Sequence, residues 1–141
     1  MIVDALKDMP RFTILDIACG DGGVLNGVAE ALPCEATGID IKEFKEWSSI
    51  KPKTKQISFQ DFIKEDKKFD VVMMLDTYRN WINHKYVDLQ KAAADKVELD
   101  KWILKNAKYF ITSFDEDPSF HGKQWRQIGT DDGHKLVIIT I

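Results

Sequence analysis

The chain has 141 residues, of which 44% are hydrophobic and 30% charged, with a mean hydropathy of −0.29. These values predict one globular domain over residues 1–141 and exclude two full domains. The net charge of −3 gives no global positive field that would attract nucleic acid or an anionic membrane. With two cysteines, no leader pattern at the N-terminus and no apolar run of about 18 residues, a cytoplasmic protein without a membrane span is expected.

The first half of the chain alternates apolar β-rich runs with helical patterns. Residues 12–18 predict a strand, and the apolar residues within 24–32 recur at helical spacing after a glycine-rich turn. Residues 35–41 predict a second strand, and residues 42–49 a short helix. Residues 55–59 alternate polar and apolar side chains, which is typical of a strand near the edge of a sheet.

Two longer patterns follow in the second half. The near-continuous apolar run of residues 69–75 predicts a strand that is buried on both faces in the middle of a parallel sheet. Leu99, Trp102 and Ile103 lie close together on a helical wheel, so residues 87–107 predict a long amphipathic helix.

The C-terminal patterns complete the predicted fold. Residues 109–114 predict a fifth strand, and residues 125–129 and 135–141 predict a hairpin around the Asp-Gly turn at 130–133. Strands that alternate with helices form a mostly parallel sheet with helices on both faces. The expected fold class is therefore α/β: a Rossmann-like three-layer sandwich with a mostly parallel seven-stranded sheet and a C-terminal antiparallel hairpin. The interval from Phe114 to Trp125 leaves little room for a linking helix, so a minimal form without a cap domain is expected.

One motif carries chemistry, and it stands where the first strand turns into the first helix. Glycines at 20, 22 and 23 let the backbone turn sharply and approach a ligand, while the helix N-terminus offers N–H groups to a carboxylate or phosphate. Asp40 follows Asp16 by 24 residues and ends the second strand, where a carboxylate can accept hydrogen bonds from ribose hydroxyls. The pattern indicates a ribosyl ligand, which Asp16 either contacts directly or supports by capping the turn.

Other ligand classes fit this motif less well. A dinucleotide-binding turn, as in a nicotinamide-dependent oxidoreductase, requires a third glycine where Leu25 stands. Cys19 has no histidine near it in sequence and is expected to be a free thiol rather than a nucleophile. No Cys or His pair has the spacing of zinc ligands, so no metal is expected.

The segment 16–22, Asp-Ile-Ala-Cys-Gly-Asp-Gly, resembles the first motif of the class I, Rossmann-like, S-adenosylmethionine-dependent methyltransferases, with Ala18 in place of the first glycine. The resemblance extends over most of the chain. Asp40 matches the ribose-binding acid of the family, residues 60–62 look like its adenine-binding segment, and residues 75–76 end the strand where methionine and substrate meet. It implies S-adenosyl-L-methionine as the cofactor, bound by Asp16, Ala18, Cys19, Gly20, Gly22, Asp40, Ile41, Asp61, Phe62 and Leu75.

The resemblance places the methyl acceptor beside the end of the fourth strand. Asp76 is the first candidate for a catalytic base, ahead of Tyr78 and His121, and Tyr78 and Trp81 are candidate substrate contacts. A solvated loop is the alternative for this segment, as a helix cap is for Asp61. The acceptor stays unidentified, because the Pro-Pro-aromatic sequence of the amino-methyltransferases is absent and Thr112 replaces the lysine of the ribose 2′-O-methyltransferases.

Two functions remain open from the sequence. One is an S-adenosylmethionine-dependent methyltransferase with an unidentified acceptor, and the other is a non-catalytic S-adenosylmethionine-binding or interaction module derived from the same fold. A site without a cap favours a large acceptor that closes it, or a small one held by a second subunit of a homo-oligomer.

Overall fold

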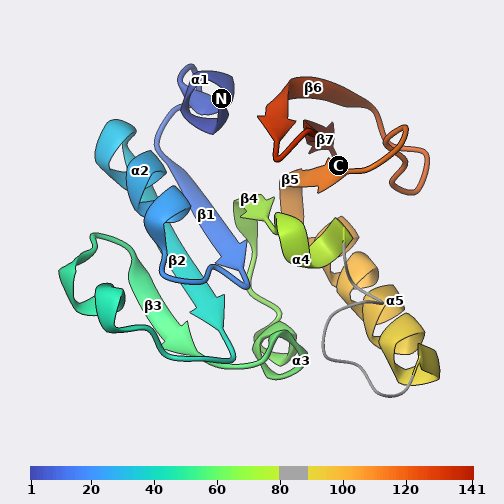
Figure 1. The fold of residues 1–141 in the computed structure, drawn as a ribbon, viewed down its shortest axis with the longest axis horizontal. Coiled ribbons are helices and arrows are strands. Elements are labelled where there is room, and N and C mark those ends of the chain that lie inside the picture. The colour runs from blue at the N-terminus through green and yellow to red at the C-terminus, as the bar shows by residue number, and fades with distance from the viewer. Residues whose placement is uncertain (80–88) are drawn as a thin grey trace.

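The computed structural model describes residues 1–79 and 89–141 (Figure 1). Its elements in chain order are α1 (Ile2–Leu6), β1 (Phe12–Ile17), α2 (Gly23–Ala31), β2 (Cys34–Asp40), the 3-10 helix η1 (Lys45–Ser49), β3 (Lys53–Gln56), α3 (Phe59–Phe62), the 3-10 helix η2 (Ile63–Glu65), β4 (Phe69–Met73), α4 (Asp76–Arg79), α5 (Leu89–Asn106), β5 (Ala107–Phe114), β6 (Trp125–Asp131) and β7 (His134–Thr140).

Within these described ranges, seven strands form one sheet in the order β3-β2-β1-β4-β5-β7-β6. The first five strands are parallel, and β7 is antiparallel to both β5 and β6. Asp132 and Gly133 join β6 to β7 with φ angles of +48° and +78°, as an Asp-Gly hairpin turn requires. The predicted sheet is confirmed, with β3 at its edge, β4 at its centre and the antiparallel hairpin at the C-terminus.

Helices cover both faces of the sheet, as Figure 1 shows by the separation of α1 and α2 from α3 and α5. Leu25 of α2 packs in the same apolar cluster as Ile14 of β1, whereas Leu99 of α5 packs in a second cluster with Leu15. Neighbouring residues of a strand point to opposite faces, so Ile14 and Leu15 contribute to different clusters. The expected three-layer sandwich is confirmed.

Some elements differ from the sequence prediction, α1 and β3 among them. The helix α1 was not predicted, because five residues are too few to show a helical period. The strand β3 covers 53–56 rather than 55–59: it pairs with residues 37–40 of β2, and the chain turns into α3 just afterwards. The Ser58 side chain caps that helix by accepting a hydrogen bond from the Asp61 N–H. The alternation of polar and apolar residues at 55–59 therefore runs from the end of β3 into the start of α3.

The connection from β5 to β6, residues 115–124, contains no helix. Because β6 runs in the same direction as β5, this segment has to return from the carboxyl end of β5 to the opposite end of the strands, where β6 begins. Phe120 is buried along the way and packs against the rings of Tyr78 and Phe110, at centroid distances of 6.2 and 5.2 Å. The short interval was expected to leave little room for a linking helix, and a buried ring lies there instead.

In the part of the chain that the structure describes, no helix combines the length and the apolar character needed to cross a membrane.

Candidate functional site

The turn between β1 and α2 is built from residues with a left-handed backbone. The φ angle is +59° at Ala18, +60° at Gly20 and +83° at Gly22. Glycine adopts such angles freely, but the Cβ of alanine disfavours them, so Ala18 carries local strain where the family has glycine. The Cys19 N–H donates to the Ile39 carbonyl at 3.0 Å, which fixes the turn against the end of β2.

Asp40 ends β2 and binds the same turn. Its Oδ2 accepts a hydrogen bond from the Gly20 N–H at 2.9 Å, and its Oδ1 accepts one from the Lys42 N–H at 3.1 Å. A carboxylate oxygen can accept two hydrogen bonds, so Asp40 retains acceptor capacity on both oxygens. Asp40 can therefore hold the turn and still make the predicted contact with a ribose.

Asp16 lies at the end of β1 and is only 4% exposed. No residue in the described ranges donates a hydrogen bond to its carboxyl group, and burial, followed by the nearby charge of Asp40, raises its pKa well above the usual value. A buried carboxyl group without a donor is costly. This end of the sheet therefore lacks a partner that a ligand with N–H groups or a positive charge would supply.

Cys19 is half-buried next to both acids. Burial, together with the charges of Asp16 and Asp40, raises the pKa of its thiol to about 12, so it stays protonated at neutral pH and is a poor nucleophile. A Cβ on Gly38 of β2 would lie only 2.8 Å from the Cys19 Sγ. Glycine at 38 therefore makes room for Cys19, a pairing between strands that sequence spacing does not reveal.

The segment after β2 packs onto the turn. The Trp47 Nε1–H donates to the Gly20 carbonyl at 2.9 Å, and a Cβ on Gly22 would lie 2.5 Å from the Ile50 Cδ1. The sequence predicted a short helix here but not this contact, because a short helical pattern does not show what it packs against.

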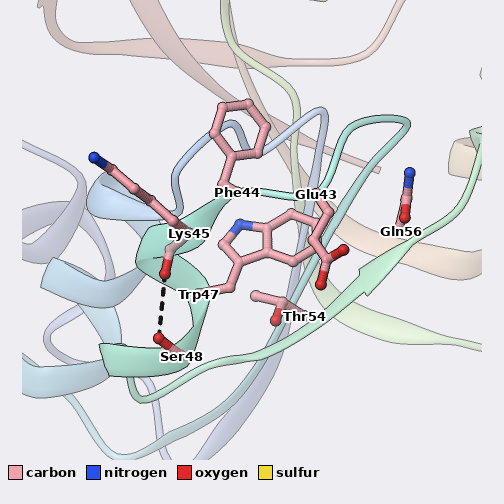
Figure 2. Close-up of a pocket in the computed structure, with 7 residues that line it drawn as sticks. All are labelled: Glu43, Phe44, Lys45, Trp47, Ser48, Thr54 and Gln56. Atoms are coloured by element: carbon pink, nitrogen blue, oxygen red, sulfur yellow. Dashed lines mark hydrogen bonds between the residues drawn. The ribbon is translucent and has the colours of Figure 1, made fainter.

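Trp47 also lines a cavity of about 660 Å³ beside the edge strand β3 (Figure 2). Figure 2 shows the indole in the middle of the group, with the Phe44 ring on one side and the Thr54 side chain on the other. The Ser48 hydroxyl donates to the Lys45 carbonyl at 3.2 Å and stabilises the helical turn that carries Trp47. The other lining residues are Glu43 and Gln56.

The other predicted cofactor-binding residues follow β2, β3 and β4. Ile41 is 54% exposed directly after Asp40. Asp61 is an exposed residue of α3 that pairs with Lys64 at 3.1 Å, and the positive charge holds the pKa of Asp61 below its usual value. The Phe62 ring is buried in the core, and Leu75 is half-buried in the cluster under α1 and α2. In this structure Phe62 is therefore a core residue, and Ile41 and Asp61 remain available to a ligand.

On the other side of β1, the carboxyl end of β4 carries a buried cation. The side chain of Arg79 is 8% exposed and that of Asp76 is 55% exposed. The Arg79 Nη2 donates to the Asp76 Oδ1 at 3.0 Å, and its Nη1 donates to the Ser113 hydroxyl at 3.1 Å. The Arg79 Nε forms an ion pair with Asp115 at 3.5 Å. One guanidinium thus connects α4 with the end of β5.

Asp131 of the hairpin brings another carboxyl group to this region. Burial, followed by the neighbouring carboxyl group of Asp76, raises the pKa of Asp131. Its Oδ2 is buried without a partner among the described residues. His134 Nδ1 contacts Asp115 at 2.5 Å. Sequence reasoning missed Asp131, since it lies 55 residues from Asp76 inside what reads as a plain turn.

The other predicted acceptor residues point elsewhere or lie outside the described residues. Tyr78 is buried and its hydroxyl donates to Asp100 of α5 at 3.0 Å. Burial and the charge of Asp100 raise the pKa of this hydroxyl. His121 contacts the other oxygen of Asp100 at 2.8 Å, so both candidate bases face α5. Trp81 lies outside the described residues.

Comparisons with known proteins place this geometry in a structural class. No protein-family model and no curated sequence matches the chain. Among solved structures, it resembles the bifunctional kinase-methyltransferase WbdD with a TM-score of 0.68 and 14% identity, over 99% of this chain and 36% of that one. It resembles SMU.776, a putative methyltransferase complexed with SAH, with a TM-score of 0.63 and 11% identity over 92% of this chain and 45% of that one.

A shorter neighbour matches over most of its own length. The putative methyltransferase YhhF from Escherichia coli has a TM-score of 0.67 and 10% identity, over 99% of this chain and 81% of that one. By contrast, this chain spans less than two fifths of the WbdD chains it matches. The sheet order and these neighbours together show that the chain has the fold of the class I methyltransferases.

Proposed function

We propose that the chain binds S-adenosylmethionine at the carboxyl ends of β1 and β2 and transfers its methyl group to an acceptor at the end of β4. The single observation that carries this proposal is Asp16, a buried carboxyl group without a hydrogen-bond donor at the left-handed turn. The cofactor fits that need, since its ammonium group donates hydrogen bonds and its sulfonium is positively charged. The neighbour SMU.776, which is complexed with SAH, supports the same ligand class.

The residues of the chain divide the binding work between them. The turn at Gly20 and the N-terminus of α2 would hold the methionine part, Asp40 the ribose, and Ile41 with Asp61 the adenine. When bound, S-adenosylmethionine supplies an electrophilic methyl carbon whose bond to sulfur breaks with the electron pair remaining on sulfur. The protein's own contribution is to position the acceptor and to exclude water.

Calorimetric titration with S-adenosylhomocysteine, S-adenosylmethionine and NAD tests the ligand class. We expect binding of the first two alone. Asp40→Ala should weaken cofactor binding by about 1–3 kcal/mol through lost charge-assisted hydrogen bonds. Asp16→Asn should weaken the binding of S-adenosylmethionine more than the binding of an analogue without its positive charge. Asp4→Asn, at an exposed position of α1, is the matched control. If neither S-adenosylhomocysteine nor S-adenosylmethionine binds, the proposal is wrong, and binding of NAD alone would favour an oxidoreductase.

A non-catalytic module is the second candidate, and one observation favours it: Tyr78 and His121, two of the candidate bases, both contact Asp100 of α5. Turnover separates the two functions. Methyl-tritiated S-adenosylmethionine and a panel of amine, hydroxyl and thiol acceptors should yield a labelled product if the chain is an enzyme. Tight cofactor binding with no label transferred to any acceptor would favour the module.

The acceptor's access to the site is part of the proposal. With no helix between β5 and β6, we infer that a large acceptor, or a second subunit, covers the carboxyl end of β4. Sedimentation velocity of the chain with and without S-adenosylhomocysteine should show whether a dimer forms. A monomer under both conditions would leave the large acceptor as the covering group.

A further inference from the structure

The connection from β5 to β6 is fixed at two points by contacts between a histidine and an aspartate. The His121 Nε2 lies 2.8 Å from the Oδ2 of Asp100 on α5. The His134 Nδ1, at the start of β7, lies 2.5 Å from the Oδ1 of Asp115. We define residues 115–121, which run from one contact to the other, as the strap. Both histidines of the described ranges therefore hold an end of the strap.

The contact at His121 joins the strap to α5 and α4. The Asp100 side chain is 9% exposed, and its Oδ1 accepts a hydrogen bond from the Tyr78 hydroxyl of α4 at 3.0 Å. Lys96 pairs with the same Asp100 oxygen that His121 contacts, at 3.8 Å. The neighbouring Phe120 ring is buried against Tyr78, with the two ring centroids 6.2 Å apart. Asp100 thus connects this end of the strap with the helix that follows β4.

The contact at His134 joins the other end of the strap to the same helix. Asp115 forms an ion pair with the Arg79 Nε of α4 at 3.5 Å. The Arg79 guanidinium in turn donates to Asp76 at 3.0 Å. Both ends of the strap are therefore tied to α4, one through Asp100 and the other through Arg79. A strap that leaves its place would uncover Tyr78 and remove one partner from Arg79.

The strength of the two contacts depends on the charge of the imidazole rings. Histidine gains a positive charge as the pH falls from about 8 to about 5, and a charge-assisted hydrogen bond is about twice as strong as a neutral one. The His121 and His134 side chains are 48% and 33% exposed, so protons reach both rings from the solvent. The charged groups that face the rings are Asp100 and Lys96 at His121, and Asp115, Arg79 and the cross-strand neighbour Asp131 at His134. Because each ring contacts a carboxylate directly, a lower pH in this range strengthens both ends of the strap.

We propose that His121 and His134 form a pH-sensitive clasp that holds the strap against α4. The strap is held firmly when both rings are protonated, and it opens more often when they are neutral. The clasp goes beyond the proposed function, because it acts in the chain itself and requires no cofactor. It governs access to the end of β4, and the conclusion that the methyl acceptor uses this access rests on the proposed function. Mildly acidic conditions would close this side of the sheet, and mildly alkaline conditions would open it.

Native-state proteolysis of the full chain tests the clasp, because a protease cuts a structured segment only after the segment has opened. Proteinase K would be used at pH 5.5 and pH 8.5, and a synthetic peptide of residues 113–124 would calibrate the rate of the protease itself at each pH. Mass spectrometry identifies the cuts that fall within the strap. Relative to the peptide, the wild-type strap should be cut about tenfold more slowly at pH 5.5 than at pH 8.5, since opening breaks both charge-assisted contacts.

Substitution of the histidines separates the effect of their charge from other effects of pH. Glutamine keeps a hydrogen-bonding amide but gains no charge, so the double variant His121→Gln/His134→Gln should be cut at the same calibrated rate at both pH values. Each single variant should keep part of the difference. Lys135→Gln is the matched control, because it removes an ion pair with Asp117 of the strap, at 3.1 Å, without changing a histidine. This control should keep the full difference between the two pH values.

Two results would overturn the clasp: equal calibrated rates at the two pH values in the wild type, or a difference that persists in the double variant. Melting temperatures near the wild-type value would show that the variants are folded. If one histidine variant is unstable, the other single variant still tests its own end of the strap. The experiment needs no cofactor, so failure of S-adenosylhomocysteine to bind would overturn the proposed function alone and leave the result for the strap unchanged.

Discussion

Two regions at the carboxyl ends of the strands carry buried charged side chains of opposite sign. At β1 and β2, Asp16 is a buried acid to which no described residue donates a hydrogen bond. At β4 and β5, Arg79 is a buried cation with acceptors on Asp76, Ser113 and Asp115. At the first end the buried acid has no donor among the described residues, whereas at the second the buried cation has acceptors on three residues. Removal of a charge should therefore have opposite effects on stability at the two ends.

The largest effect is expected at the end around Arg79. Arg79→Met leaves the buried Ser113 hydroxyl without its donor and leaves the carboxylates around it without their cation. Loss of one partner from a buried ion pair costs about 3–5 kcal/mol, and we expect about 2–3 here, because Asp76 and Asp115 are more than half exposed. Urea denaturation at pH 7 measures this loss. Lys7→Met, which removes an exposed pair with Asp4, should barely move the midpoint, and an equal loss in both variants would contradict the comparison.

Tight packing at the cofactor end should give the next effect. Gly38→Ala places a Cβ against Cys19 and Leu25, and overpacking of this kind destabilises by about 1–3 kcal/mol. Thermal melting should recover part of the loss in the double variant Cys19→Ala/Gly38→Ala, because the Sγ is the closest atom. Gly27→Ala on the open face of α2 is the control and should stabilise by about 0.5–1 kcal/mol. Strictly additive effects at 19 and 38 would argue against the contact.

Asp16→Asn should stabilise the protein at pH 7 by about 1–2 kcal/mol, since it removes a buried ionisable group that lacks a donor. The pKa of Asp16 is higher in the folded state than in the unfolded chain. Folding therefore favours the protonated form, and wild-type stability should fall as the pH rises from the unfolded pKa through the folded one. Denaturation midpoints between pH 4 and 8 should show a smaller fall in the variant. A destabilised Asp16→Asn would mean that the acid already has a partner.

The smallest effect sharpens the description of the cofactor end. Trp47→Phe removes one hydrogen bond to the Gly20 carbonyl while keeping an aromatic ring, and should cost about 0.5–1.5 kcal/mol. S-adenosylhomocysteine affinity should fall as well if this contact holds the turn in shape. Trp125→Phe, at an exposed position on β6, is the matched control. Equal affinities in both variants would show that the turn keeps its shape without Trp47.

Much of the fold could be predicted because its signals are local. The apolar run at 69–75 identified β4 as the central strand, and the Asp-Gly pair identified the hairpin. The prediction of a strand over 55–59 was wrong in its bounds, because the polar and apolar alternation continues past the end of the strand to Ser58, which caps a helix. The resemblance assigned Phe62 to the adenine; its ring packs in the core, and its contact with the cofactor stays a prediction.

The sequence by itself determined the chain order of the seven strands, the glycine turn and the presence of acids at 16 and 40, since each depends on residues close together in the chain. The tertiary structure alone decided that Gly38 accommodates Cys19, that Trp47 binds the turn, and that Arg79 joins Asp76 to Ser113 and Asp115. These contacts join segments that are far apart in the sequence, so no periodic pattern of residues predicts them. They form only because the parallel strands bring their carboxyl ends to one edge of the sheet and the hairpin returns there.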